Sequence, residues 1–308
     1  MNIAFQMDDL SKINFLTDST ISIIIESQLR GNKNYIYLPE DLIIQNNEVY
    51  ALSRKISFNI KEPKNYKITP KKILKLSNMK IIFVRQDPPF NMSYITSLHI
   101  LELLDSKKTR VVNDPRGIRN SPEKILIFDF PKLIPPTIVT RSKHQVTEFL
   151  KKYKKAVIKP LYGNGGESVF LISKKDLNLN QIVESFLTGN KEPFIVQKYL
   201  PEIIRGDKRI ILINGKPVGA VARVPKKNEI RSNIHVGGLA KKTLISKSDQ
   251  LICNAIGPEL KKRKLFFVGI DVIGQYLTEI NVTSPTCIRE IKNLSNVDIA
   301  KTIWDELV

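Results

Sequence analysis

Two carboxylates and an amide lie within one apolar stretch near the carboxyl end of the chain. Residues 266–286 read FFVGIDVIGQYLTEINVTSPT, in which Asp271, Glu279 and Asn281 interrupt runs of Val, Ile, Phe and Leu. A carboxylate inside an apolar strand is costly unless something compensates its charge. Carboxylate and amide oxygens that converge on one point are suited to Mg²⁺. This stretch alone permits either a divalent metal site or a polar strand that faces solvent.

The spacing of these residues predicts a β-hairpin with a glycine at its turn. A two-residue turn at 274–275 would pair Asp271 with Thr278 and would place carboxylates on both faces of the sheet. A three-residue connection at 274–276 would pair Asp271 with Glu279 instead. One face would then be almost wholly apolar, and the other would carry both acids and the amide together. We expect the three-residue connection, because only it separates the two faces.

A glycine-rich segment, GNGG at 163–166, lies between two strand-like stretches. It lacks the GK[ST] ending of a P-loop and the strand–GxGxxG–helix context of a dinucleotide site. It is therefore either an ordinary turn or a flap whose backbone amides approach phosphate oxygens. Lys159, just before it, is either an exposed strand lysine or a residue that faces a nucleotide.

A later hairpin carries Asp207, Lys208, Arg209 and Arg223. These residues form either a solvated sheet edge or a clamp for phosphate and carboxylate groups, whose oxygens match the guanidinium fork. The three histidines lie far apart, at positions 99, 144 and 235. They show no metal spacing, and no nucleophile-elbow motif supports a serine hydrolase.

The elements that must position these residues change in character along the chain. The first third alternates strands with helices, which predicts a parallel sheet covered by helices. The expected strands are 2–7, 35–39, 80–85 and 110–114, and the expected helices are 17–30 and 91–107. A Ser-Pro pair near 120–124 predicts a domain boundary and a new helix that ends before Pro131.

The remaining two thirds read mainly as hairpins and predict an α+β half. The expected hairpins are 155–172, 208–224 and 266–282, with a strand at 194–201 and a helix at 248–264. The second hairpin contains Asn-Gly at 214–215, the strongest short-range hairpin signal.

Composition restricts the class of protein. A chain of 308 residues with 42% hydrophobic residues is long enough for about two domains with a substantial core. No apolar run approaches the ~20 residues of a membrane span, and the opening residues lack the layout of a signal peptide. Cys253 and Cys287 provide neither a disulfide framework nor zinc spacing. We therefore expect a cytoplasmic protein with no membrane partner.

The formal net charge of +19 raises the question of a nucleic-acid partner. The lysines are spread along the whole chain and do not form one stripe with interleaved aromatic residues. We therefore expect no nucleic-acid partner, although a basic nucleic-acid-binding protein stays the alternative from a different class.

The order of these features carries more information than any one of them. The order resembles that of the ATP-grasp ligases. It runs from a lysine that opens a helix to a strand lysine, a glycine-rich flap, a strand with a polar end, an arginine-bearing hairpin and an acid–acid–Asn cluster. Four segments are similar to the bacterial glutathione synthetase family: MDDLSKINFLTDST at 7–20, VRQDPPF at 84–90, GDKRIILINGKPV at 206–218 and VGIDVIGQYLTEINVTSPTCIRE at 268–290. The similarity extends to about residue 291, and INVTSPTCIRE is highly specific to this family within the superfamily.

The resemblance implies an ATP-grasp fold of mixed α/β and α+β class. An N-terminal parallel α/β domain would bind substrate at 1–121. A central α+β lid with the glycine-rich flap would occupy 122–194. A C-terminal α+β subdomain with the metal site would occupy 195–308, and the two subdomains would close over ATP.

The resemblance also implies roles for individual residues. The nucleotide would contact Lys124, Lys159, Gly163, Gly165, Gly166, Gln197, Lys198, Tyr199, Leu200 and Asp207. Mg²⁺, with Mn²⁺ as the alternative ion, would bind Asp271, Glu279 and Asn281. The catalytic residues would be Arg209, Arg223 and Arg231. Substrate would contact Arg85, Asn233, Ser284 and Thr286.

The implied reaction is ATP-dependent ligation of γ-glutamylcysteine to glycine through an acyl phosphate, in a homo-oligomer that is a tetramer in the family. The segment 224–238 would be the loop that shields this intermediate. It departs from the family pattern at Lys227-Asn228, where a glycine pair is usual, which puts its flexibility in doubt. Another ATP-grasp carboxylate–amine ligase is the alternative within the superfamily.

Overall fold

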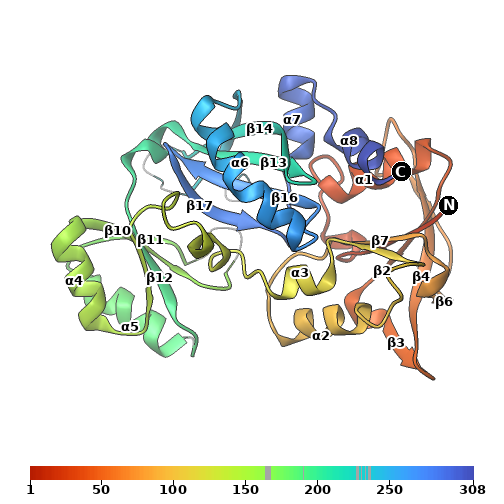
Figure 1. The fold of residues 1–308 in the computed structure, drawn as a ribbon, viewed down its shortest axis with the longest axis horizontal. Coiled ribbons are helices and arrows are strands. Elements are labelled where there is room, and N and C mark those ends of the chain that lie inside the picture. Colours follow the sequence, from red (N-terminus) through yellow and green to blue (C-terminus); the bar gives the residue numbers. More distant parts are fainter. Residues whose placement is uncertain (164–167, 190, 227–228, 230, 233, 235–236) are drawn as a thin grey trace.

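Three sheets account for the architecture of the computed structural model (Figure 1). The structure describes residues 1–308 except 164–167, 190, 227–228, 230, 233 and 235–236. The N-terminal part and the C-terminal part pack side by side, and a central lobe projects from them. Short 3₁₀ helices lie at η1 (Leu10–Lys12), η2 (Pro39–Asp41), η3 (Leu76–Asn78), η4 (Leu126–Asp129) and η5 (Pro201–Arg205).

The N-terminal sheet is half parallel and half antiparallel, with the order β3-β4-β2-β1-β7-β8. Its parallel strands are β1 (Asn2–Gln6), β2 (Lys33–Tyr37), β7 (Ile81–Val84) and β8 (Arg110–Val112). Its antiparallel strands are β3 (Leu42–Gln45), β4 (Glu48–Phe58), β5 (Tyr66–Ile68) and β6 (Lys72–Lys75). The predicted parallel sheet is therefore only half of it. The strands within 42–75 were not predicted, because their alternating, half-buried pattern is a weaker sequence signal for a strand than the continuous apolar runs of β1 and β7.

Helices α1 (Ser19–Leu29), α2 (Met92–Leu101) and α3 (Pro115–Arg119) belong to this part. Asp18 caps α1 by accepting a hydrogen bond from the backbone N–H of Ile21, and Gly31 follows its end with a φ of 76°. The helix expected at 17–30 is confirmed, and Asp18 and Gly31 mark its two ends.

The central lobe is a four-stranded antiparallel sheet in the order β11-β10-β12-β9, with two helices. Its elements are β9 (Thr137–Thr140), α4 (Lys143–Tyr153), β10 (Lys155–Pro160), β11 (Phe170–Ser173), α5 (Leu179–Gly189) and β12 (Phe194–Lys198). It has a core of its own, in which Phe149, Ile158 and Phe186 are buried. The helix predicted just before it is wrong, because that connection forms only the 3₁₀ turn η4.

The C-terminal sheet has the order β15-β14-β13-β16-β17. Its strands are β13 (Asp207–Ile213), β14 (Lys216–Val224), β15 (Leu239–Lys242), β16 (Phe267–Ile273) and β17 (Tyr276–Asn281), and its helices are α6 (Lys247–Lys262), α7 (Ile288–Ser295) and α8 (Ile299–Leu307). The predicted turn between β13 and β14 is confirmed, since Asn214 and Gly215 both take positive φ, 50° and 71°. Helices α7 and α8 pack against α1 and so join the two ends of the chain.

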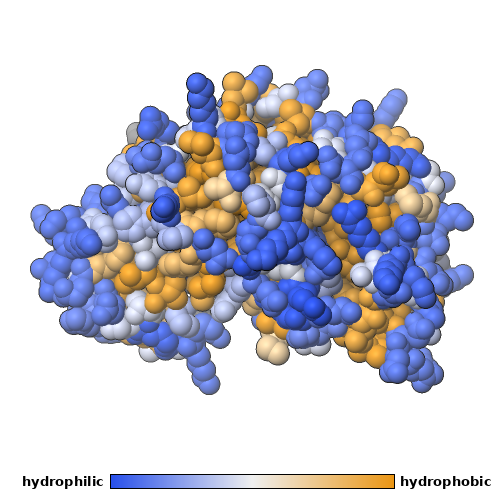
Figure 2. Space-filling view, in the orientation of Figure 1, coloured by the Kyte–Doolittle hydropathy of each residue, from blue (hydrophilic) through white to orange (hydrophobic). Residues whose placement is uncertain are grey.

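Hydrophilic side chains are spread over all three parts on the face drawn in Figure 2. Among the helices of the described residues, none combines the length and the apolar character that crossing a membrane would require.

Candidate active site

The β16–β17 hairpin places its acids as the sequence predicted, but by a different route. Asp271 pairs with Glu279, and Gly269 pairs with Asn281, so both acids and the amide share one face. The three-residue connection is wrong, because the turn contains only Gly274 and Gln275. A β-bulge between Asp271 and Val272 takes up the extra residue and restores the pairing.

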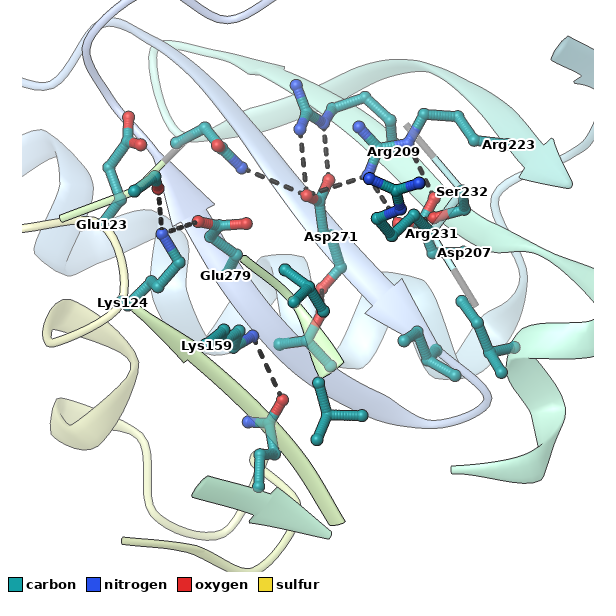
Figure 3. A pocket seen from close by; sticks show the side chains of 18 of the residues that line it. Glu123, Lys124, Lys159, Asp207, Arg209, Arg223, Arg231, Ser232, Asp271 and Glu279 are labelled. Carbon is teal, nitrogen blue, oxygen red and sulfur yellow. Dashed lines mark hydrogen bonds and ion pairs between the residues drawn. The ribbon is translucent and has the colours of Figure 1, made fainter. Parts of the chain in front are cut away.

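This face forms one wall of a pocket of about 250 Å³ that all three parts of the chain line. Figure 3 shows side chains from the hairpins of the C-terminal sheet and from the central lobe converging on it. The predicted residues that line it are Lys124, Lys159, Gly163, Gln197, Lys198, Tyr199, Leu200, Asp207, Arg209, Arg223, Arg231, Asp271, Glu279, Asn281, Ser284 and Thr286. Gly165, Gly166, Asn233 and the Lys227-Asn228 pair lie outside the described residues.

Asp271 is held by two arginines at the centre of the pocket (Figure 3). Arg209 binds it in a bidentate manner, with Nε–Oδ1 of 2.5 Å and Nη2–Oδ2 of 2.9 Å. Nη2 of Arg223 lies 2.9 Å from Oδ2, and Nδ2 of Asn281 lies 3.4 Å from it. Burial opposes the charge of Asp271, but the two guanidinium groups outweigh it and hold the pKa of this carboxyl well below its usual range. Cations of the protein therefore compensate this acid.

Asp207 extends the same network. Arg223 donates to both of its oxygens, from Nε at 2.7 Å and from Nη2 at 2.6 Å. The hydroxyl of Ser232 donates to Oδ2 at 2.7 Å. Burial works against the charge of Arg223, but Asp207 and Asp271 raise its pKa well above the usual value. Two buried acids and two buried arginines thus balance in charge. No sequence pattern had pointed to Ser232.

Glu279 stands apart from this network. Its Oε1 lies 3.3 Å from Nζ of Lys124, which also donates to the backbone carbonyl of Gly163 at the start of the flap. Glu279 keeps 21% of its side chain exposed, whereas Lys124 keeps 9%. Lys124 therefore connects the metal-binding candidate Glu279 with the flap.

The donor set on the β16–β17 face fits a hard divalent cation. Asp271, Glu279 and Asn281 offer carboxylate and amide oxygens from neighbouring positions of two paired strands. Within the described residues, no group of three His, Cys, Asp or Glu side chains is gathered closely enough to bind a metal without other ligands.

On the central lobe, Lys159 and Gln197 face the pocket from β10 and β12. Nζ of Lys159 lies 3.4 Å from Oε1 of Gln197, whose Nε2 donates to the hydroxyl of Thr137 at 3.0 Å. Burial lowers the pKa of Lys159. The following backbone, 198–200, leaves the strand at the rim of the pocket.

Arg85 is buried beside the pocket but does not line it. Its Nε donates to Thr20 at 3.1 Å and its Nη2 donates to the backbone carbonyl of Pro285 at 2.9 Å. Its own carbonyl accepts from the hydroxyl of Ser284 at 3.1 Å. Nη1 is buried and has no partner among the described residues. Arg85 therefore supports the segment 284–286 from outside the pocket lining, and its contact with substrate stays a prediction.

Arg231 lines the pocket from the connection between β14 and β15. Its backbone N–H donates to Oε1 of Glu229 at 3.1 Å and its Nη2 lies 2.7 Å from Oε2. With 36% of its side chain exposed, Arg231 is the most accessible of the three arginines at the site.

Glu123 is a site residue that sequence reasoning missed. It lines the pocket next to Lys124, and its Oε1 accepts hydrogen bonds from the residues that follow β17. Burial, with the nearby charge of Glu279, raises its pKa. The one available signal was its place beside a predicted nucleotide contact.

Comparison with known proteins gives two family matches that together span almost the whole chain. Residues 1–119 match the N-terminal domain of prokaryotic glutathione synthetase, and residues 123–296 match its ATP-grasp domain. The glutathione synthetase of Agrobacterium fabrum is 44% identical over 99% of this chain and 96% of its own length. That of Buchnera aphidicola subsp. Acyrthosiphon pisum is 40% identical over the same shares.

Solved structures with low sequence identity share the fold. The D-cycloserine synthetase DcsG superposes with a TM-score of 0.71 at 14% identity, over 100% of this chain and 98% of that one. The ATP-grasp ligase PsnB, complexed with a minimal precursor, gives a TM-score of 0.64 at 16% identity, over 99% and 97%. The ATP-grasp fold expected from the sequence is confirmed.

Proposed function

The chain belongs to the prokaryotic glutathione synthetase family, and from this premise we propose how its pocket performs the reaction. It is an ATP-dependent ligase that joins γ-glutamylcysteine to glycine and releases ADP and phosphate. The observation that carries the assignment of roles is the convergence of sixteen predicted residues on one pocket that all three parts of the chain line.

The nucleotide lies between the central lobe and the C-terminal sheet. Lys124 and Lys159 neutralise its phosphates, since both line the same pocket. The backbone of 197–200 reads the adenine edge where β12 ends. Asp207 meets the ribose at the cost of its hydrogen bond with Ser232, because both of its oxygens are already engaged.

Asp271, Glu279 and Asn281 hold Mg²⁺, for which Mn²⁺ can substitute. When bound, the ion would neutralise negative charge on the phosphate groups. The arginines on Asp271 leave room for this role, because within the described residues Oδ1 accepts a single hydrogen bond, from Nε of Arg209, and a carboxylate oxygen has two lone pairs. Glu279 supplies the carboxylate that Lys124 engages only at 3.3 Å.

The chemistry has two steps. The cysteinyl carboxylate attacks the γ-phosphorus of ATP, which forms an acyl phosphate and releases ADP. The amine of glycine then attacks the acyl carbon, loses a proton, and expels phosphate. Arg209 and Arg223 orient the carboxylate and the transferred phosphoryl group, and Ser284 and Thr286 line the side where the peptide substrate lies. Positioning and charge neutralisation are the work of this chain's residues.

Three further proposals rest on the resemblance alone. The functional divisions of the chain fall at 121/122 and 194/195, the protein assembles as a homo-tetramer, and it is cytoplasmic. Limited proteolysis tests the domain divisions, and sedimentation tests the tetramer.

A coupled assay tests the function. The purified chain with ATP and Mg²⁺ should release ADP only when γ-glutamylcysteine is present, and should produce glutathione when glycine is added. ADP release that depends on a different acceptor pair would indicate another ATP-grasp ligase. Tight, salt-resistant binding to duplex DNA without ligase turnover would favour the nucleic-acid class, since contacts to phosphate alone weaken steeply with salt.

Replacing Arg231 with Ala should uncouple the reaction. We expect ATP hydrolysis to persist while glutathione formation falls about tenfold, because an arginine at the pocket mouth keeps water from the acyl phosphate. The measurement is the ratio of phosphate released to tripeptide formed at saturating glycine. Arg116→Ala, which removes an arginine with 72% of its side chain exposed, is the control and should keep the ratio near one. If the ratio also stays near one in Arg231→Ala while both rates fall together, the shielding role is wrong.

A further inference from the structure

Glu123 lies in the connection between the N-terminal part and the central lobe, immediately before Lys124. One of its carboxylate oxygens, Oε1, accepts three hydrogen bonds: from the backbone N–H of Val282 at 2.8 Å, from that of Thr283 at 3.0 Å, and from the hydroxyl of Thr283 at 2.8 Å. Its backbone carbonyl accepts a fourth, from the N–H of Ile280 at 3.2 Å. A single residue thus binds the main chain on both sides of Asn281.

A second side chain, that of Asn113, binds the same segment through a backbone carbonyl, whereas Glu123 binds it through backbone N–H groups. Nδ2 of Asn113 donates to the carbonyls of Val282 and Phe267, each at 2.8 Å, and its Oδ1 accepts from the N–H of Phe267 at 2.7 Å. The N–H of Val282 is therefore held by Glu123 and its carbonyl by Asn113. These contacts fix the end of β17 against the beginning of β16.

The segment held in this way carries residues of the site on both sides. Asn281 precedes it and directs its amide toward Asp271, with 3.4 Å between Nδ2 and Oδ2. Ser284 follows it, lines the pocket, and donates to the carbonyl of Arg85 at 3.1 Å. A shift of the main chain at 282–283 would therefore move the metal side and the substrate side of the pocket together.

We propose that Glu123 is a positioning residue for the ligase reaction. Its carboxylate fixes residues 282–283 and its backbone carbonyl holds Ile280, so that Asn281 faces the metal and phosphate groups while Ser284 faces the peptide substrate. The inference rests on the proposed function of the pocket. It assigns Glu123 no contact with the reacting atoms, because its hydrogen-bonded oxygen is directed at the main chain.

A carboxylate is suited to this task by its chemistry, and the position of Glu123 beside Lys124 links the task to the rest of the site. A carboxylate oxygen can accept several N–H and O–H donors at once, and hydrogen bonds to a charged acceptor are stronger than neutral ones. The next residue, Lys124, donates to the flap carbonyl of Gly163 and pairs with Glu279 at 3.3 Å. Adjacent side chains of one short connection therefore position the end of β17, the metal-binding candidate Glu279 and the first residue of the flap.

The first experiment measures the main chain directly. In Glu123→Ala, hydrogen–deuterium exchange at the amides of Val282 and Thr283 should accelerate at least about tenfold, because both lose their acceptor. In Glu123→Gln the amide oxygen still accepts these bonds, so exchange should stay within about threefold of wild type. Unchanged exchange in Glu123→Ala would overturn the proposal.

The second experiment measures the site. Mn²⁺ is titrated in the presence of ADP and followed by electron paramagnetic resonance. Removing a group that orients a metal ligand typically weakens binding about 10-fold to 100-fold, and we expect this for Glu123→Ala. Binding of ADP without metal should stay at the wild-type affinity, since the adenine edge at 197–200 belongs to the central lobe. Glu123→Gln should recover most of the Mn²⁺ affinity.

The matched control is Glu102→Ala. Glu102 is half-buried, as Glu123 is. Its carboxylate pairs with Arg116 and Arg119, and it lies outside the pocket lining. It should lower the melting temperature without changing Mn²⁺ affinity or exchange at 282–283. An equal loss of Mn²⁺ affinity in Glu102→Ala, or wild-type Mn²⁺ affinity in Glu123→Ala, would overturn the positioning role.

Thr283→Val keeps the test decisive if Glu123→Ala does not fold. It removes one of the three donors to Oε1 at nearly constant shape, and should weaken Mn²⁺ binding by about twofold to fivefold while ADP binding is unchanged. No change in Mn²⁺ binding would count against the proposal. A wild-type chain that makes no glutathione and binds no Mn²⁺ beside ADP would instead overturn the proposed function, and the positioning role with it.

Discussion

Asp271→Asn is expected to destabilise the fold by about 3–5 kcal/mol, because removing one partner of a buried ion pair leaves the other charge uncompensated. Asp271 is 5% exposed and contacts both Arg209 and Arg223. Asparagine has the same shape, but its amide group would turn a donor toward the guanidinium donors. The measurement is urea unfolding, in which the midpoint should fall while the slope of the transition stays constant.

The same contact predicts how this difference depends on pH. The pKa of Asp271 is lowered in the folded state, so its ionisation contributes stability in full above the unfolded value of about 3.9. The contribution is lost as the pH falls from there toward the folded pKa. The difference in stability between wild type and Asp271→Asn should therefore be constant from about pH 5 to 8 and should narrow below about pH 4. A difference that widens in acid would contradict the ion-pair argument.

Asp249→Asn is the matched control. Asp249 is 1% exposed, pairs with Lys208, and accepts from the backbone of Ser246 in the capping box of α6. It compensates one cation, and Lys208 keeps 21% of its side chain exposed, so a smaller loss of about 1–2 kcal/mol is expected, with full activity. A loss in Asp271→Asn no larger than in Asp249→Asn would show that the two arginines tolerate a neutral partner.

The elements that sequence patterns predicted well are those with local signals. The Asn-Gly turn, the cap of α1 and the strands β1 and β7 follow from residue type and short-range periodicity. The antiparallel strands β3 to β6 depend on pairing across the sheet, which no local pattern specifies. The 3₁₀ turn η4 replaced an expected helix because its short segment is fixed by contacts with β17.

The site shows a similar division. The pairing of Asp271 with Glu279 was predicted because it gives the hairpin one apolar and one polar face. The structure achieves this pairing through a β-bulge, for which the sequence has no recognisable signal. The family resemblance implied that a metal ion compensates Asp271, whereas Arg209 and Arg223 do so in the fold. Those arginines lie on β13 and β14, and only the sheet order brings them to the hairpin. The role of Glu123 was not predicted for the same reason, since its hydrogen-bond partners are about 160 positions away along the chain.

Glu279→Gln should leave the fold intact and remove most of the activity. Within the described residues its ion pair is with Lys124 at 3.3 Å, and the amide oxygen of glutamine can still accept a hydrogen bond from that ammonium group. As a metal ligand, however, Glu279 supplies a negative charge that an amide lacks. A metal ion contributes several kcal/mol to phosphoryl transfer, so kcat/KM should fall about 100-fold to 1,000-fold at limiting Mg²⁺.

Unfolding by urea and steady-state rates across a range of Mg²⁺ concentrations measure the two effects separately. We expect an unchanged midpoint and a half-saturating Mg²⁺ concentration raised at least about tenfold, with partial recovery of the rate at high Mg²⁺. Glu259→Gln is the control, because Glu259 has a similar exposed fraction, 28%, and pairs with Arg263 on α6 away from the pocket. It should match wild type in both measurements. Normal turnover of Glu279→Gln at limiting Mg²⁺ would refute the metal assignment. The acid on β17 would then serve only to hold Lys124 against the flap, a role that glutamine can fill through its amide oxygen.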